Sequence, residues 1–226
     1  MLKIALVTLF GMILSAGAFE ILREGRPACV LALPENATEL ERKAAEELKY
    51  FLDQSSGCSF AVIPETKAEG PAIYLGWSEY ARKAGLDYAS ADREEWILRS
   101  DAHNLCITGG RPAGTLYGVY EFLEKLGFYF LSKDCTVFPE TLPATLDPLD
   151  ERKKPAFPGR NVFDLFSWPA FVTGVPQERH QAHWLYRLRS RLNGGHGIAR
   201  KDFPDALYLG FPFNLTMSYH TLSYYV

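Results

Sequence analysis

The stretch that decides the fold is Cys106-Ile-Thr-Gly-Gly-Arg-Pro-Ala-Gly-Thr-Leu-Tyr-Gly-Val-Tyr-Glu-Phe-Leu-Glu-Lys-Leu-Gly-Phe-Tyr-Phe-Leu131. Its short apolar start ends at Gly109-Gly110, which is typical of a buried strand that runs into a tight turn. Apolar residues then recur at intervals of three and four, which predicts an amphipathic helix with Pro112 in its first turn. Gly127 follows the helix as a left-handed C-terminal residue, and a second apolar strand begins at Phe128.

The glycines of this stretch also resemble a phosphate-binding loop in their spacing, from Gly109 to Gly114 and Thr115. A Walker A loop carries a Lys after its last glycine, because that Lys reaches the β- and γ-phosphates. No Lys stands at this position. A tight turn between strand and helix is therefore favoured, and we expect no nucleotide or other cofactor.

Upstream, Thr38 and Glu41 form a capping box that predicts the start of another amphipathic helix. One face of this helix is apolar, and the other is expected to be solvated. The charged residues of the expected solvated face are Glu41, Lys43, Glu46, Glu47 and Lys49.

The segments around these two helices predict a sheet. Apolar runs indicate strands at residues 28–33, 59–63, 72–75, 95–99 and 104–108, the last two forming a hairpin. A short helix is expected within residues 80–91. The order of elements predicts an α+β domain over residues 19–150, a mixed sheet with two helices on one face.

The motif from Gly109 to Leu123 resembles the signature of a non-catalytic domain that precedes the catalytic barrel in some glycoside hydrolases. It is similar to the N-terminal domains of family 67 α-glucuronidases and family 20 β-hexosaminidases, and to bacterial proteins that carry domain of unknown function 4838. The resemblance covers residues 28–140, with a weaker continuation to the end. It implies the N-terminal part of a glycoside hydrolase-like protein that acts on a polysaccharide or glycoconjugate.

Residues 1–18 have the pattern of a secretory signal peptide, with Lys3, an apolar run over residues 4–14 and the sequence Ala16-Gly-Ala18. We therefore expect an exported protein, periplasmic or extracellular, that is not in the membrane after cleavage. The 24 Lys and Arg residues are outnumbered by 27 Asp and Glu. This mildly acidic balance, without a basic run, argues against nucleic acid and anionic membranes as partners. Carbohydrate is the expected partner.

Four cysteines are present, Cys29, Cys58, Cys106 and Cys135. An even number in an exported chain permits two disulfides, with three possible pairings. Cys29 and Cys106 stand in apolar runs, where a buried free thiol is slightly favoured. Both interpretations remain open from the sequence. The high aromatic content, 14%, suits sugar stacking, but a large core is the favoured explanation.

Residues 151–158 are charged and rich in proline, which predicts a linker. A helix is predicted within residues 178–193, with Ala182, Leu185, Leu188 and Leu192 on its apolar face. Residues 159–226 are far fewer than the roughly 250 that a (β/α)₈ barrel needs. They are therefore expected to form the truncated start of a (β/α)₈-type barrel, an incomplete N-terminal part. The resemblance implies substrate-binding roles for Arg160 and His220.

No catalytic residues are predicted within this chain. Glycoside hydrolysis normally needs a pair of carboxyl groups, and the resemblance places them on later barrel strands. Asp164, Glu178, Asp202 and Asp205 are favoured as caps or solvated charges, and the chain alone is expected to be inactive. His180 and His183 lack a third ligand, so no metal site is expected. Three hypotheses remain: part of a glycoside hydrolase, a carbohydrate-binding accessory module, or a purely structural brace.

Overall fold

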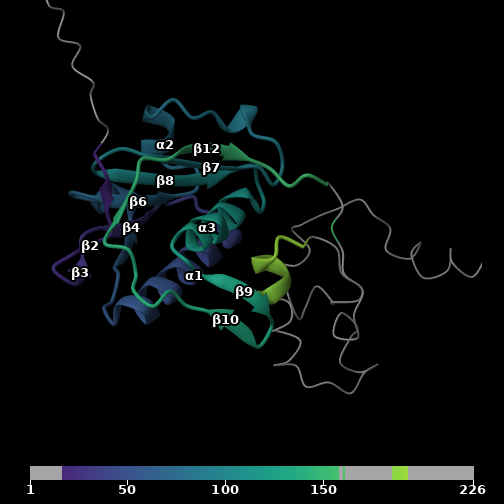
Figure 1. Cartoon of the computed structure of the whole chain (residues 1–226). Helices are drawn as coiled ribbons and strands as arrows, with labels where there is room; N and C mark the ends of the chain where they lie inside the picture. Colours follow the sequence, from purple (N-terminus) through teal and green to yellow (C-terminus); the bar gives the residue numbers. More distant parts are fainter. Residues whose placement is uncertain (1–16, 158–159, 161–184, 193–226) are drawn as a thin grey trace, which may run out of the picture.

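The computed structural model describes residues 17–157, residue 160 and residues 185–192 (Figure 1). Residues 1–16 of the predicted signal peptide, His220 and most of the predicted barrel segment lie outside these residues. The centre of the described structure is a six-stranded sheet in the order β12-β7-β8-β6-β4-β5. Its strands are β4 (Val30–Leu33), β5 (Val62–Pro64), β6 (Ala72–Leu75), β7 (Trp96–Ser100), β8 (Asn104–Gly109) and β12 (Asp150–Lys153).

The sheet is mixed, as the order of elements predicts. Strands β5, β4, β6 and β8 are parallel neighbours, whereas β7 runs antiparallel to β8 and to β12. The predicted hairpin is confirmed, because β7 and β8 pair across the turn that contains His103. The prediction of a linker over residues 151–158 is wrong for residues 151–153, because these residues belong to strand β12. The charged side chains of β12 are compatible with its position at the edge of the sheet.

Two helices, α1 (Glu39–Ser56) and α3 (Gly114–Lys125), lie side by side on one face of the sheet (Figure 1). They bury the main core, whose α3 residues include Leu116, Tyr117, Val119, Tyr120 and Leu123. The predicted apolar stripe of this helix is therefore confirmed. A short helix, α2 (Glu79–Lys83), covers the opposite face, where the Tyr80 ring stacks on Tyr74 of β6 at 4.3 Å.

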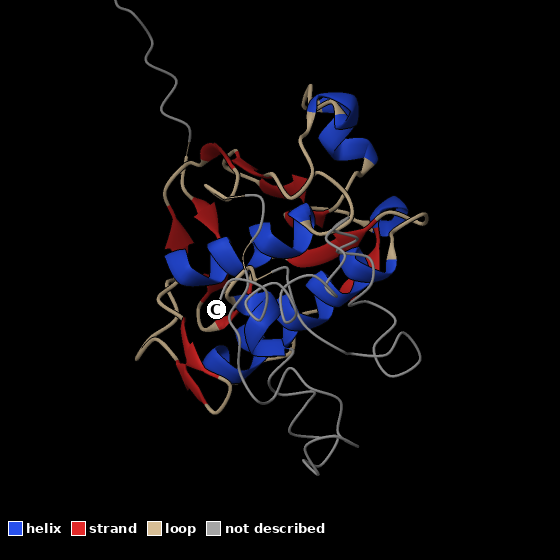
Figure 2. Cartoon of the chain, turned by 90° about the vertical axis from the view of Figure 1, so that its right-hand side faces the viewer, coloured by secondary structure: helices blue, strands red, loops and turns tan. Residues whose placement is uncertain are grey.

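Short elements complete the domain. Two 3₁₀ helices are η1 (Glu65–Lys67) and η2 (Tyr88–Ser90), and the remaining strands are β1 (Phe19–Glu20), β2 (Leu22–Arg23), β3 (Arg26–Pro27), β9 (Tyr129–Ser132), β10 (Cys135–Val137) and β11 (Thr145–Leu146). Strand β1 pairs with β11, so the start of the domain is fastened to its end. The hairpin of β9 and β10 lies at the edge of the domain, apart from the six-stranded sheet (Figures 1 and 2).

The predicted capping box of α1 is confirmed. The Thr38 Oγ1 accepts a hydrogen bond from the Glu41 N–H at 3.2 Å, and Glu41 accepts one from the Thr38 N–H at 2.7 Å. The expectation that Glu41 and Glu47 face solvent is wrong, because both are buried. Each carboxylate meets an arginine from a distant part of the chain, Arg111 and Arg189 respectively.

The glycines in the turn between β8 and α3 allow neighbouring backbone segments to pack closely. A Cβ atom at Gly109 or Gly114 would overlap the Glu95 carbonyl, and one at Gly110 would overlap the Asp92 carbonyl. The Gly110 N–H donates to the Glu95 carbonyl at 2.9 Å, so this donor points into the protein and away from any phosphate. Helix α3 begins at Gly114, and Pro112 therefore lies in the preceding turn, not in the first helical turn as predicted. Gly127 is left-handed, as predicted.

All four cysteines lie within the described residues, and all four are free thiols. Cys29 and Cys106 are buried, as the apolar runs around them indicate. Burial raises the pKa of each of these two thiols to about 12. The disulfide alternative is therefore not realised in this structure.

Candidate functional site

The first candidate site is the surface where residues 160 and 185–192 meet the domain. Residues 185–189 are helical and lie beside β9 and α3 (Figure 1). Leu188 is buried in the main core, and Leu185 packs against it. The apolar face predicted for this helix is thus confirmed at both positions.

The helix ends at Arg189, before the predicted end at Asn193. The Arg191 N–H donates to the Leu188 carbonyl at 2.9 Å, and the Leu192 N–H donates to the Arg187 carbonyl at 2.8 Å. This is a Schellman arrangement, in which the residue after the cap is left-handed and usually Gly. Here that residue is Arg191, with φ 54°. A side chain in this conformation is uncommon and indicates that other contacts hold it there.

Those contacts are ion pairs with α3. Arg191 Nη2 lies 3.1 Å from a Glu121 oxygen and 2.9 Å from a Glu124 oxygen, and Arg191 Nη1 donates to Glu124 at 3.0 Å. The guanidinium also lies 5.2 Å from the centre of the Trp96 ring. Arg191 therefore joins the end of its helix to α3 and β7 at once.

A second pair joins the same segment to α1. Arg189 Nε and Nη2 each lie 2.9 Å from a Glu47 oxygen, and both side chains are largely buried. The guanidinium also lies over two aromatic rings, 5.0 Å from the centre of Phe51 and 5.6 Å from that of Phe130. Planar guanidinium groups favour such positions, because they stack on rings while their edge donates to a carboxylate.

Arg160, the residue for which the resemblance implies sugar binding, lies in this same surface. It donates to the Phe157 carbonyl at 2.6 Å, to the Arg191 carbonyl at 2.7 Å and to Glu94 at 3.0 Å. It also lines a cavity of about 420 Å³ together with Arg93, Lys154 and Phe157. The contacts that the structure shows are thus to protein groups, and its contact with sugar stays a prediction.

Two tyrosines of α3 support this surface from inside. The Tyr117 hydroxyl donates to Glu94 at 3.2 Å, and the Tyr120 hydroxyl donates to Glu47 at 3.3 Å. Both rings are buried, and desolvation raises the pKa of both phenols above the ordinary value. Neither ring can stack on a sugar, so α3 has a structural role. Through these two hydrogen bonds, α3 orients Glu94 and Glu47, the carboxylates that pair with arginines of the second segment.

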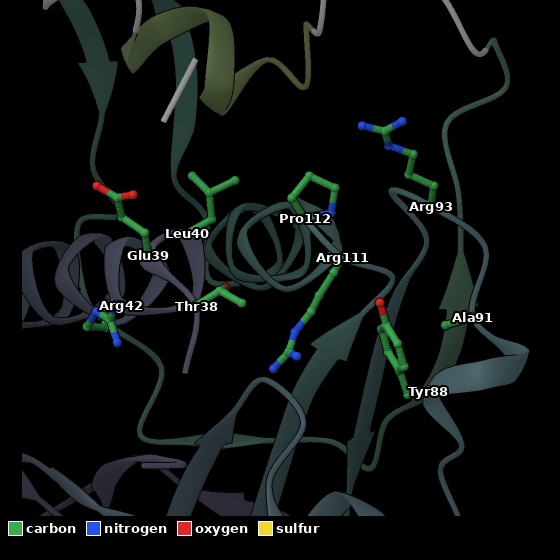
Figure 3. Close-up of a pocket in the computed structure, with 9 residues that line it drawn as sticks. All are labelled: Thr38, Glu39, Leu40, Arg42, Tyr88, Ala91, Arg93, Arg111 and Pro112. Carbon is green, nitrogen blue, oxygen red and sulfur yellow. The ribbon is translucent and has the colours of Figure 1, made fainter. Parts of the chain in front are cut away.

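A pocket of about 770 Å³ lies beside this surface, between the start of α1 and the turn before α3 (Figure 3). Its lining includes Thr38, Arg42, Tyr88, Arg93, Arg111 and Pro112, and we refer to it as the Arg111 pocket. The sequence pattern does not reveal this pocket, because its residues come from three separate segments. The only local signal was Arg111, which stands inside the glycine motif.

Metal binding finds no support in the described part of the chain, which contains no cluster of three His, Cys, Asp or Glu side chains suited to a metal ion. His180 and His183 lie outside that part, as does His220. None of the described helices has the length and apolar character needed to cross a membrane.

No protein-family model matches the chain, and no curated protein matches it either. Among solved structures, the chain is similar to a family GH115 4-O-methyl-α-glucuronidase with specificity for decorated arabinogalactans. The TM-score is 0.58 over 78% of this chain, at 16% sequence identity. The chain spans 25% of the length of that structure. At this identity the likeness shows a shared fold, and the domain is α+β and related in fold to part of a glycoside hydrolase.

Proposed function

We propose that residues 19–150 form a non-catalytic accessory domain that braces the following domain of an exported, glycoside hydrolase-like protein. The relation to families 20 and 67, and to domain of unknown function 4838, is part of this proposal. The residues that follow, 159–226, would be the start of the braced domain. The fold shared with a glycoside hydrolase supports the proposal. The ion pairs of Arg160, Arg189 and Arg191 with glutamates of the first domain are the bracing contacts that we propose.

The observation that carries the proposal is the left-handed Arg191 held between α3 carboxylates. A backbone conformation that disfavours a side chain is retained where surrounding contacts determine it. Here the contacts are two glutamates and the Trp96 ring, all on the accessory domain. The geometry of the second segment thus depends on the surface of the first, as a brace requires.

The lack of catalysis in this domain follows from how its carboxylates are used. Hydrolysis needs one carboxyl group to deliver a proton and another to act as base or nucleophile. Glu47, Glu94 and Glu121 are all largely buried, and each faces a guanidinium of the second segment. The oxygens of these carboxylates bond to arginines and are not available for catalysis. We therefore place the catalytic pair in the domain that is braced.

The hairpin of β9 and β10 extends the proposed bracing surface. Tyr129, Leu131, Val137 and Phe138 are exposed there. Exposed apolar groups that cluster next to an interface mark a contact surface. Phe138 shares a cavity of about 320 Å³ with Leu185 and Arg189, so the apolar surface is continuous with the docked helix. We assign it to contact with the rest of the following domain.

The substrate is proposed at the level of a class. The solved structure of similar fold is a glucuronidase, specific for decorated arabinogalactans. A polysaccharide or glycoconjugate is therefore the substrate class proposed for the whole protein, with export supported by the signal-like residues 1–18.

A double-mutant cycle across Arg191 and Glu124 tests the brace. Arg191→Ala, Glu124→Ala and the double variant are made in the full chain, and their free energies of unfolding are measured in urea. We expect a coupling of about 1–3 kcal/mol, because the two side chains contact each other directly. The matched control is the exposed pair Arg82 and Glu79 on α2, for which no measurable coupling is expected, because solvent screens the two charges. Equal, negligible coupling at both pairs would refute the brace.

A further inference from the structure

Arg160 connects three parts of the chain through one guanidinium group. Its Nη1 atom donates to the Phe157 carbonyl, its Nε atom to the Arg191 carbonyl and its Nη2 atom to Glu94. Phe157 follows strand β12, Arg191 follows the helix of the second segment, and Glu94 precedes strand β7. The Arg160 side chain is only 14% exposed. Two of its three acceptors are backbone carbonyls, so Arg160 determines where the backbone lies as well as pairing with a charge.

Two of the residues that Arg160 contacts have a left-handed backbone. The φ angle is 65° at Glu94 and 54° at Arg191. Glu94 lies in a turn closed by a 3.0 Å hydrogen bond from the Glu95 N–H to the Asp92 carbonyl, and Arg191 lies at a helix end. Both positions ordinarily favour Gly. Side chains are retained in this conformation where the surrounding contacts determine it, and Arg160 is a contact that the two residues share.

The Glu94 side of this contact is rigid. Its Oε1 atom accepts hydrogen bonds from the Tyr117 hydroxyl at 3.2 Å and from Arg160 at 3.0 Å, and Glu94 is only 4% exposed. A buried carboxylate needs such donors, because it has lost its water. The Arg160 guanidinium also lies 5.9 Å from the centre of the buried Tyr117 ring. Helix α3 therefore fixes the place of Arg160 through Glu94 and Tyr117.

The Arg191 side of this contact is bound at two points. Its carbonyl accepts from Arg160 Nε at 2.7 Å, whereas its side chain pairs with Glu121 and Glu124 of α3. The backbone conformation of Arg191 determines the directions of both its carbonyl and its side chain. The bond from Arg160 to the carbonyl therefore favours the conformation in which the side chain reaches α3.

We propose that Arg160 is a positioning residue that couples the end of the accessory domain at Phe157 to the end of the docked helix at Arg191. Through Glu94 and the Arg191 carbonyl, it holds Arg191 in its left-handed conformation and so makes the junction one cooperative unit. This inference rests on the proposed bracing function, because it concerns the same surface. The role needs no bound sugar.

The test is amide hydrogen exchange of the full chain, measured residue by residue by NMR. The amides of Ser190, Arg191 and Leu192 donate to carbonyls of the docked helix, so their protection reports local opening of the junction. Arg160→Gln should lower their protection at least about tenfold, the factor that corresponds to the loss of one charge-assisted hydrogen bond. The amide of Val119 in α3 should keep its protection. Unchanged protection of the three amides, or an equal loss at Val119, would overturn the proposal.

The conservative variant separates positioning from charge. A guanidinium group donates in several directions within one plane, whereas the donors of a Lys side chain radiate from a single nitrogen. Arg160→Lys should therefore lower the protection of the Arg191 amide about as much as Arg160→Gln does. Protection equal to that of the parent would show that a positive charge beside Glu94 is sufficient, and the proposal would fall. The matched control is Arg99→Gln, because Arg99 also bonds a carboxylate and a carbonyl, those of Asp150 and Ala84. It should leave the Arg191 amide unchanged.

A double-mutant cycle tests the coupling itself. Glu94→Gln should lower the protection of the Arg191 amide about tenfold in the parent, but less than about twofold in the Arg160→Gln background, because Arg160 transmits the effect. An equal effect in both backgrounds would contradict the proposal. The cycle of Arg191 and Glu124 described above tests the brace separately. If that cycle shows coupling while the Arg160 variants leave exchange unchanged, the brace stands and the role of Arg160 falls.

Discussion

Arg111 and Glu41, which are 70 residues apart in the sequence, form a two-point ion pair that ties the turn before α3 to the first turn of α1. Glu41 is fully buried, and it also completes the capping box of α1. Gly76 makes room for it, because a Cβ atom at that position would lie 2.8 Å from the Glu41 carboxyl carbon. One carboxylate therefore connects a helix cap, a glycine turn and the Arg111 pocket.

This relationship predicts a large effect of Arg111→Ala on stability. The substitution leaves a buried carboxylate without its cation, which typically costs about 3–5 kcal/mol. Urea denaturation measures the change in the free energy of unfolding. Arg82→Ala, which removes an exposed ion pair with Glu79, is the control and should leave the free energy of unfolding almost unchanged, because solvent screens the two charges. A similar small cost for both variants would show that the Arg111 pair contributes nothing special.

The pair of Glu95 and Arg152 predicts a pH dependence. The hydrogen bond from Arg152 lowers the pKa of Glu95 below its ordinary value of 4.5. A carboxyl group with a lowered folded-state pKa stabilises the fold above its unfolded-state pKa, and this stabilisation disappears as the pH falls through the folded-state value. Arg152→Gln should therefore reduce stability at pH 7 by up to about 1 kcal/mol. At pH 2 the difference from the parent protein should be much smaller.

The measurement is a series of urea denaturation curves for the parent and Arg152→Gln between pH 2 and pH 7. Arg26→Gln is the control, because Arg26 is exposed and forms no ion pair with the described part of the chain. Its effect should not vary with pH. An effect of Arg152→Gln that stays constant across the series would contradict the role of Glu95.

The cysteines predict a graded reactivity. The thiolate is the reactive form of cysteine, and burial raises the pKa of Cys29 and Cys106 to about 12. At pH 8 a thiol reagent should modify the exposed Cys135 first, whereas Cys29 and Cys106 should react only after unfolding. Mass spectrometry of modified peptides in buffer and in urea checks this order. Thiols that stay unreactive in urea would instead indicate disulfides.

Local patterns in the sequence predicted the local structure well. The capping box of Thr38 and Glu41, the hairpin of β7 and β8 and the left-handed Gly127 are all found in the structure. Each depends on residues that are close in the sequence, so its physical cause is visible there. The same is true of the apolar stripe of α3, whose spacing directly reflects the helical repeat.

Long-range charge pairing could not be predicted in this way. Helical periodicity places Glu47 on the polar face of α1, yet its partner Arg189 is 142 residues away. A charged strand such as β12 is equally hard to recognise, because edge strands expose their side chains and lack an apolar run. The proposed brace and the Arg111 pocket both depend on such pairings, so the fold was more predictable than either site.

The last prediction concerns the buried face of α3, which carries the core of the domain. Leu123 of α3 is fully buried in the main core of the domain. Leu123→Ala should cost about 2–5 kcal/mol, because it removes apolar contacts and leaves a cavity. This is a large share of the roughly 5–15 kcal/mol by which a domain is stable. Chemical denaturation of the variant and the parent measures the cost.

The control for this prediction must be a helical residue that faces water. Glu124 does not qualify, because it contacts Arg191. Glu46 of α1, whose side chain is 69% exposed, is suitable, and Glu46→Ala should change stability by less than about 0.5 kcal/mol. Equal unfolding midpoints for Leu123→Ala and the parent would mean that the apolar stripe is not packed, and the domain would then lack the rigid core that a brace needs.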